Sequence, residues 1–92
     1  MRAQELPRFE SVEEVVNAVA EVRDELALRG HEMEAQELTS ALERFYTTAS
    51  EALGEIREAL RETREAWETL SSNYQRLAEH AMKEATRLLR MI

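Results

Sequence analysis

The sequence predicts an all-α fold. A heptad-spaced series of apolar residues occupies the C-terminal half, and only an α-helix places such a series on one face. Helix breakers are scarce, because Pro7, Gly30 and Gly54 are the only residues with strong punctuating power. The chain has 92 residues, of which 43% are hydrophobic and 34% are charged, and we expect one small helical domain spanning 1–92.

The first predicted helix covers residues 11–29 and follows a polar arm, residues 1–10, that we expect to be flexible. Ser11 and Glu14 have the spacing of a capping box at its start. Gly30 suits the left-handed position that ends many helices. The apolar stripe of this helix consists of Val12, Val15, Val19, Val22 and Leu26.

A second helix is predicted over 31–46. The tight connection at Gly30 implies that it forms an antiparallel hairpin with the first helix. A break is expected next, because Thr48 and Glu51 repeat the capping-box spacing. The alternative is fusion with the helix that follows, since the apolar phase is compatible across the junction. The stripe of the second helix consists of Met33, Leu38, Ala41, Leu42 and Phe45.

A long third helix is predicted over 48–91. Its seam keeps the same register through the only weak point, Ser71–Asn73, where a loop would normally reset the phase. The alternative is a break near Ser71–Asn73, which would close a compact four-helix bundle. The seam consists of Leu53, Ile56, Leu60, Thr63, Trp67, Leu70, Tyr74, Leu77, Ala81, Glu84, Leu88 and Met91.

This helix would be about 66 Å long, far longer than a hairpin with helices of about 28 and 24 Å. The uncovered part of the seam predicts a homodimeric coiled-coil bundle, because a lone chain would expose an apolar strip. Residues 1–70 carry a net charge of −9 and residues 71–92 a net charge of +2, which favours antiparallel pairing. The predicted interface consists of Trp67, Leu70, Tyr74, Leu77, Ala81 and Leu88.

No residue set in the sequence points to catalysis, a cofactor or a metal, and we expect no enzyme. Cysteine is absent. Neither His31 nor His80 has a glutamate three residues before it, as a di-metal helical bundle requires. Glu84, the one acidic residue of the seam, is expected to turn outward, because an unpaired buried carboxylate costs several kcal/mol.

Charge and hydropathy restrict the partners. There are 19 acidic and 12 basic side chains, and the net charge of −7 argues against nucleic-acid binding. No apolar stretch of membrane-spanning length and no signal-peptide pattern is present, so we expect no membrane partner and a cytoplasmic location. Arginine outnumbers lysine eleven to one, which we interpret as the coding bias of a GC-rich bacterium.

The expected function is a non-enzymatic helical protein–protein interaction module. It would act as a homodimeric scaffold or adaptor, or as a small acidic chaperone- or antitoxin-like protein with a heterologous partner. The alternative is a peripheral protein that binds nucleic acid or a membrane surface through its basic C-terminal end, which contains Arg76, Lys83, Arg87 and Arg90.

Overall fold

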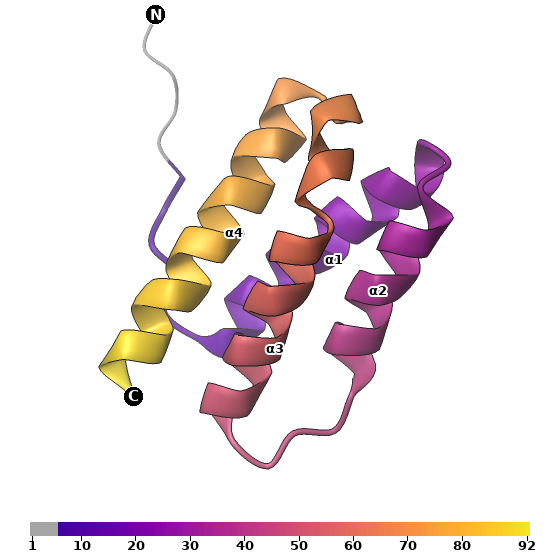
Figure 1. Cartoon of the computed structure of the whole chain (residues 1–92). Helices are drawn as coiled ribbons and strands as arrows, with labels where there is room; N and C mark the ends of the chain where they lie inside the picture. The colour runs from indigo at the N-terminus through magenta and orange to yellow at the C-terminus, as the bar shows by residue number, and fades with distance from the viewer. Residues whose placement is uncertain (1–5) are drawn as a thin grey trace, which may run out of the picture.

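The computed structural model describes residues 6–92, whose α-helices pack into a four-helix bundle (Figure 1). Each α-helix runs antiparallel to the preceding one, and α1 lies behind the other three and contacts each of them. The all-α fold is therefore confirmed, and residues 6–92 contain no strand. The helices are α1 (Val12–Leu28), α2 (Glu32–Glu43), α3 (Ala49–Glu62), the 3-10 helix η1 (Arg64–Thr69) and α4 (Ser72–Met91).

Helix α1 begins and ends as its sequence signals indicate. The Ser11 hydroxyl accepts a hydrogen bond from the Glu14 N–H at 3.4 Å. At the other end Gly30 has a φ of 87°, and the His31 N–H donates to the Leu26 carbonyl at 2.9 Å. This backward bond is typical of a left-handed helix terminus, and it satisfies a carbonyl that the helix itself leaves unpaired.

The α2–α3 connection falls close to the predicted break. Helix α2 ends at Glu43, and the Thr48 hydroxyl caps α3 by accepting from the Glu51 N–H at 3.1 Å. Because α2 ends before Phe45, this side chain leaves the expected apolar stripe and is 88% exposed. Met33, in the first turn of α2, is also outside the core and 84% exposed.

The predicted continuous helix over 48–91 is wrong. Helix α3 ends at Glu62, and the chain turns through η1 and the extended residues Leu70 and Ser71 before α4 begins. The predicted alternative, a compact four-helix bundle with a break near Ser71–Asn73, describes the structure. The physical reason is burial, because α4 folds back and covers a seam that a straight helix would leave in water.

The described part of the polar arm packs against α4. Residues 6–10 lie along α4, and Phe9 is only 8% exposed (Figure 1). A buried ring and hydrogen bonds attach this segment to α4, and the flexibility expected of residues 1–10 stays a prediction. Residues 1–5 lie outside the described residues.

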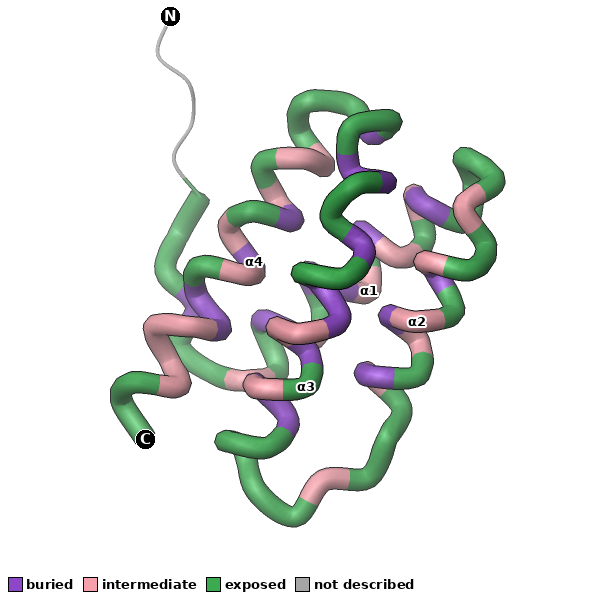
Figure 2. Tube along the Cα trace, viewed as in Figure 1, coloured by how far each residue is buried: buried purple, intermediate pink, exposed green. Residues whose placement is uncertain are grey.

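The core lies between the inward faces of the helices (Figure 2). Helices α1 and α3 supply most of the branched aliphatic side chains, whereas α4 supplies mainly alanines, namely Ala78, Ala81 and Ala85. Small side chains let the α4 backbone approach its neighbours closely. One charged residue, Glu84, shares this buried face of α4, and it marks the most unusual site in the molecule.

Candidate peptide-binding site on helix α4

The residues predicted to form a dimer interface do not form an open surface. Trp67 is 3% and Leu70 is 4% exposed, and Ala81 is fully buried. These three side chains belong to the core of the same chain. Tyr74, Leu77 and Leu88 are half-buried and pack against that core. The expected exposed seam is therefore absent, because the bundle itself covers it.

A different set of α4 residues forms the candidate site. His80, Glu84 and Arg87 are spaced by four and three residues, which places them along one face of the helix. Residues 7–9 of the N-terminal arm lie against this face. We call the three side chains the α4 recognition stripe.

The recognition stripe binds the backbone of the arm. The Phe9 N–H donates to the Glu84 Oε1 atom at 2.7 Å, and the Arg87 Nη2 atom donates to the Phe9 carbonyl. The His80 Nε2 atom lies 2.6 Å from the Pro7 carbonyl oxygen, and a carbonyl only accepts, so Nε2 carries the proton. Each residue of the stripe thus pairs with a main-chain group of an extended segment.

One side chain of the arm completes the contact. The Phe9 ring belongs to the hydrophobic core, and it meets the His80 ring edge to face, with ring centroids 5.0 Å apart. Burying a phenylalanine side chain contributes about 1.5–3 kcal/mol. The arm is therefore held by an apolar anchor and by hydrogen bonds that do not depend on its other side chains.

Glu84 is buried and yet ionised. Its side chain is 4% exposed, and Arg87 binds it through Nε and Nη2, at 3.2 and 2.9 Å from Oε1. The hydrogen bonds from Arg87 lower the pKa of Glu84, against the opposing effect of burial, and the Phe9 N–H lowers it further. The expectation that Glu84 turns outward is wrong, because Arg87 and the arm supply the partners that a buried carboxylate needs.

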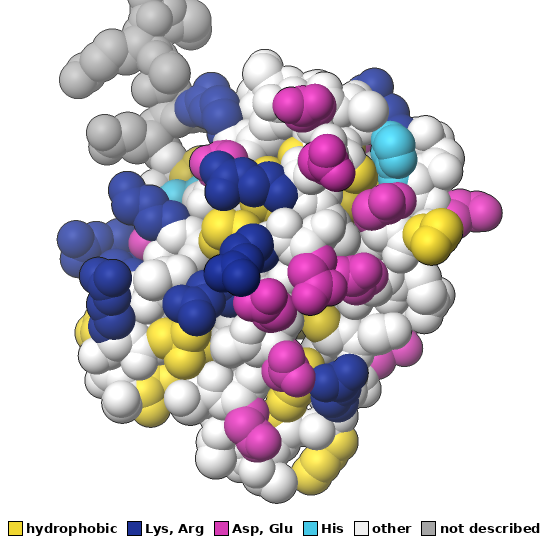
Figure 3. Space-filling view, viewed as in Figure 1, with side chains coloured by type: hydrophobic (Ala, Val, Ile, Leu, Met, Phe, Trp, Pro, Cys, Tyr) yellow, Lys and Arg dark blue, Asp and Glu magenta, His cyan; other side chains and the backbone are white. Residues whose placement is uncertain are grey.

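The surface around the stripe is basic. Lys and Arg side chains gather over α4 in Figure 3, whereas acidic side chains occupy the surface toward α3 and α2. A groove of about 1060 Å³ beside the arm is lined by Leu6, Arg8 and α4 residues between Ser72 and Arg87. A second groove of about 560 Å³ is lined by α4 between Glu79 and Met91. Both grooves adjoin the recognition stripe and extend the surface open to a ligand.

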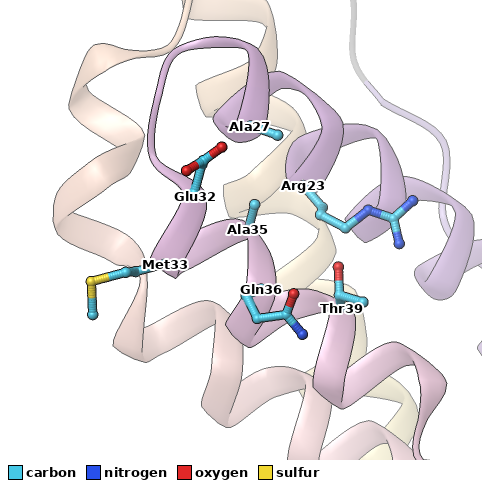
Figure 4. A pocket seen from close by; sticks show the side chains of 7 residues that line it. All are labelled: Arg23, Ala27, Glu32, Met33, Ala35, Gln36 and Thr39. Carbon is cyan, nitrogen blue, oxygen red and sulfur yellow. The ribbon is translucent and has the colours of Figure 1, made fainter.

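A groove between α1 and α2 is less suited to recognition (Figure 4). It measures about 740 Å³ and combines a few apolar side chains with charged and amide groups. Arg23 pairs with its neighbour Asp24 at 3.1 Å, and Met33 is largely exposed. The lining residues are Arg23, Ala27, Glu32, Met33, Ala35, Gln36 and Thr39.

A close pair of carboxylates lies between α2 and α3. Hydrogen bonding to the Glu62 side chain raises the pKa of Glu37, and burial and the charge of Glu62 act in the same direction. The pair lines a small groove of about 250 Å³ together with Arg44 and Glu55, which form their own ion pair at 2.8 Å. Within residues 6–92 no group of three or more His, Cys, Asp or Glu side chains is arranged to hold a metal ion.

The remaining histidine has a structural position. His31 Nε2 lies 3.0 Å from the Thr69 hydroxyl, and Nδ1 lies 3.8 Å from a carboxylate oxygen of Glu34. These contacts join the α1–α2 turn to the end of η1. Both histidines are thus occupied by partners in the folded chain.

The recognition stripe was only partly accessible to sequence analysis. Glu84 stood out as the one acid in an apolar series, whereas nothing in the sequence analysis singled out Phe9. Their contact joins residues 75 positions apart, and no local pattern predicts such a pairing.

Comparisons with protein-family models, with curated proteins and with solved structures found no match to this chain. In the described part of the chain no helix has the length and apolar character needed to cross a bilayer.

Proposed function

We propose that this protein is a non-enzymatic helical interaction module that binds an extended segment of a partner protein on the α4 recognition stripe. One observation carries the proposal. Three side chains on one helix face bind main-chain groups of an extended segment, while the adjoining core and the His80 ring bury an aromatic side chain of that segment. The protein's own residues 7–9 occupy the site and display the ligand chemistry that it accepts.

Backbone recognition makes the site tolerant of sequence. A partner segment needs a carbonyl at the position of Pro7, an N–H and a carbonyl at the position of Phe9, and an aromatic side chain there. Peptide-binding domains commonly combine main-chain hydrogen bonds for affinity with a pocket for specificity. The basic surface around α4 favours acidic residues on either side of the aromatic anchor.

The arm competes with any partner for the stripe. A tethered segment has an effective concentration in the roughly millimolar range. A partner segment therefore displaces the arm only if its affinity for the stripe is high enough to compete with that effective concentration. This competition suits an adaptor or a chaperone-like protein, whose site stays covered until its client is present. The partner in this proposal is heterologous, because the folded chain exposes neither Trp67 nor Leu70 for pairing with a second copy.

The test uses the full chain with the substitution Phe9→Ala and a fluorescein-labelled peptide with the sequence of residues 6–11. Removing the anchor weakens the arm, so the labelled peptide should bind this variant at least tenfold more tightly than it binds the unsubstituted chain. Fluorescence anisotropy measures the affinity. A peptide with alanine in place of its phenylalanine is the matched control.

The second substitution Arg87→Ala, added to Phe9→Ala, should abolish peptide binding, since it removes the donor to the anchor carbonyl. Circular dichroism verifies that the variants remain helical. Equal affinity for the two peptides, or binding that survives Arg87→Ala, would contradict the proposal.

A second candidate function is binding to an anionic surface, either nucleic acid or membrane. The observation that favours it is the groove in which Arg8, Arg76, Lys83 and Arg87 lie together. Retention on heparin that decreases steeply with salt would support this function. Elution at low salt, together with no co-flotation with anionic vesicles, would contradict it.

A further inference from the structure

The turn between α3 and α4 is held by hydrogen bonds and not by a residue that restricts the backbone: Gln75 Nε2 donates to the Leu70 carbonyl and the Thr69 hydroxyl to the Ala66 carbonyl, both at 2.8 Å. It has neither glycine nor proline, and no non-glycine residue among residues 6–92 has a positive φ. Leu70 and Ser71 adopt extended conformations that any residue can adopt, and the Ser71 side chain makes no capping hydrogen bond. Helix ends normally carry at least one such local stop signal.

The apolar register continues through this turn. Leu60, Thr63, Trp67, Leu70 and Tyr74 follow steps of three and four residues, as they would in one straight helix. If the turn served only to separate two helices, the spacing of apolar residues in α4 would not need to continue that of α3. The sequence therefore remains compatible with a continuous helix from α3 to α4.

The segment that links the helices is imperfectly satisfied. Helix η1 spans six residues, whereas 3-10 helices rarely exceed three or four. The indole N–H of Trp67 is buried without a hydrogen-bond partner. Polar contacts that hold the segment include those from Arg29 to the Thr69 carbonyl and from His31 to the Thr69 hydroxyl, both 3.0 Å.

We propose that this chain has a second form, in which α3, η1 and α4 make one continuous helix and two copies exchange their α4 helices. The α4 helix of each copy would pack on α1 and α3 of the other, so that the α1–α4 and α3–α4 contacts are rebuilt between copies while α1, α2 and α3 keep their contacts within each copy. Exchange of an identical element is a low-cost route to a dimer. Because α4 runs antiparallel to α3, the two long helices would lie antiparallel.

The exchange also rebuilds the recognition stripe between copies. The arm precedes α1 and docks on α4, so in the dimer the Phe9 ring of one copy would lie against the α4 helix of the other. This inference does not depend on the proposed binding of a partner peptide, since it follows from the α3–α4 turn alone. A monomer that binds peptide and never exchanges would disprove only the dimer.

The test measures a distance within one chain. The chain contains no cysteine, so spin labels attach only at the introduced positions Ser50→Cys and Arg90→Cys. Both positions lie at the same end of the bundle, whose largest dimension is 35 Å (Figure 1). In a continuous helix the same positions are separated by about 60 Å, from a rise of 1.5 Å per residue.

Labelled protein is mixed with excess unlabelled protein, heated, and cooled at millimolar concentration. Size-exclusion chromatography with light scattering then separates monomer from dimer. We expect a dimer fraction whose pulsed electron paramagnetic resonance distance is near the longer value. A sample that stays monomeric, or a dimer that keeps the short distance, would overturn the proposal.

The matched variants are Ser72→Pro and the triple substitution Ser71→Ala, Ser72→Ala, Asn73→Ala. Proline is tolerated at Ser72 in the compact form, because this is the first position of α4 and Ser71 is already extended. The same proline would break a continuous helix. Ser72→Pro should therefore stay monomeric, whereas the triple substitution should enlarge the dimer fraction. Dimer formation by the proline variant would also overturn the proposal.

Discussion

Glu84 is the residue whose surroundings depart furthest from ordinary helix packing. It lies among alanines on the inner face of α4, where a carboxylate is stable only with complete pairing. Arg87 and the Phe9 N–H supply that pairing, and the same contacts hold the arm. One side chain thus links the stability of the bundle to the position of its N-terminal segment.

Glu84→Gln should lower the free energy of unfolding by about 1–3 kcal/mol, because hydrogen bonds to a buried charged group are replaced by weaker ones. Urea denaturation followed by circular dichroism measures this change. The control is Glu79→Gln on the exposed side of α4, where the ion pair with Arg64 contributes less than about 1 kcal/mol. Equal effects at the two positions would contradict the role of Glu84.

The contribution of Glu84 should depend on pH. Its pKa is lowered in the folded chain, chiefly by hydrogen bonds from Arg87. The folded state therefore favours the ionised form, and this stabilisation is present above the ordinary pKa of 4.5 and lost as the pH falls through the folded value. The difference in unfolding free energy between the original chain and Glu84→Gln should shrink below pH 4.5. A constant difference down to pH 3 would show that the charge is not the cause.

At the scale of the helices, the two glycines have opposite roles. Gly30 ends α1 in a left-handed conformation, whereas Gly54 lies inside α3 with ordinary helical geometry. A Cβ atom at either position would meet no atom within 4 Å, so substitution tests backbone conformation without steric clash.

Gly30→Ala should destabilise the protein by about 1–2 kcal/mol, because an L-residue is strained at this φ. Gly54→Ala should stabilise it by about 0.5–1 kcal/mol, because alanine loses less backbone freedom in a helix. Thermal denaturation of the two variants measures both changes. Shifts of the same sign would mean that the end of α1 is not set by Gly30.

At the scale of the whole molecule, burial of apolar surface decides the architecture. A chain of this size has a small core, and its net stability is only a few kcal/mol. The bundle buries Trp67 and Leu70 in the core of the single chain, together with most of its other large apolar side chains. Single changes in that core should therefore have large effects.

Leu26→Ala should destabilise the bundle by about 2–5 kcal/mol, since Leu26 is fully buried and its truncation leaves a cavity. Leu28, two residues later on α1, is 82% exposed, and Leu28→Ala should change stability by less than about 0.5 kcal/mol. The urea midpoint distinguishes the two variants. Similar midpoints would indicate that α1 does not pack as described.

Helix positions and buried faces could be predicted from the sequence where local periodicity decides them. Val15, Val19, Val22 and Leu26 recur at helical spacing, and the structure buries all four. The recognition stripe could not be predicted in this way. The Glu84–Phe9 contact depends on the path of the arm over α4, which no short window of sequence specifies.

The sequence by itself determined that the chain is helical, where α1 begins and ends, and which face of α1 is apolar, because these properties depend on residues within one or two helical turns. Only the tertiary structure decided that α3 and α4 are separate and that the arm binds Glu84. A straight helix and a hairpin have the same local pattern from Leu60 to Tyr74. The hairpin is favoured because its apolar α4 face is buried against α1 and α3 when α4 folds back.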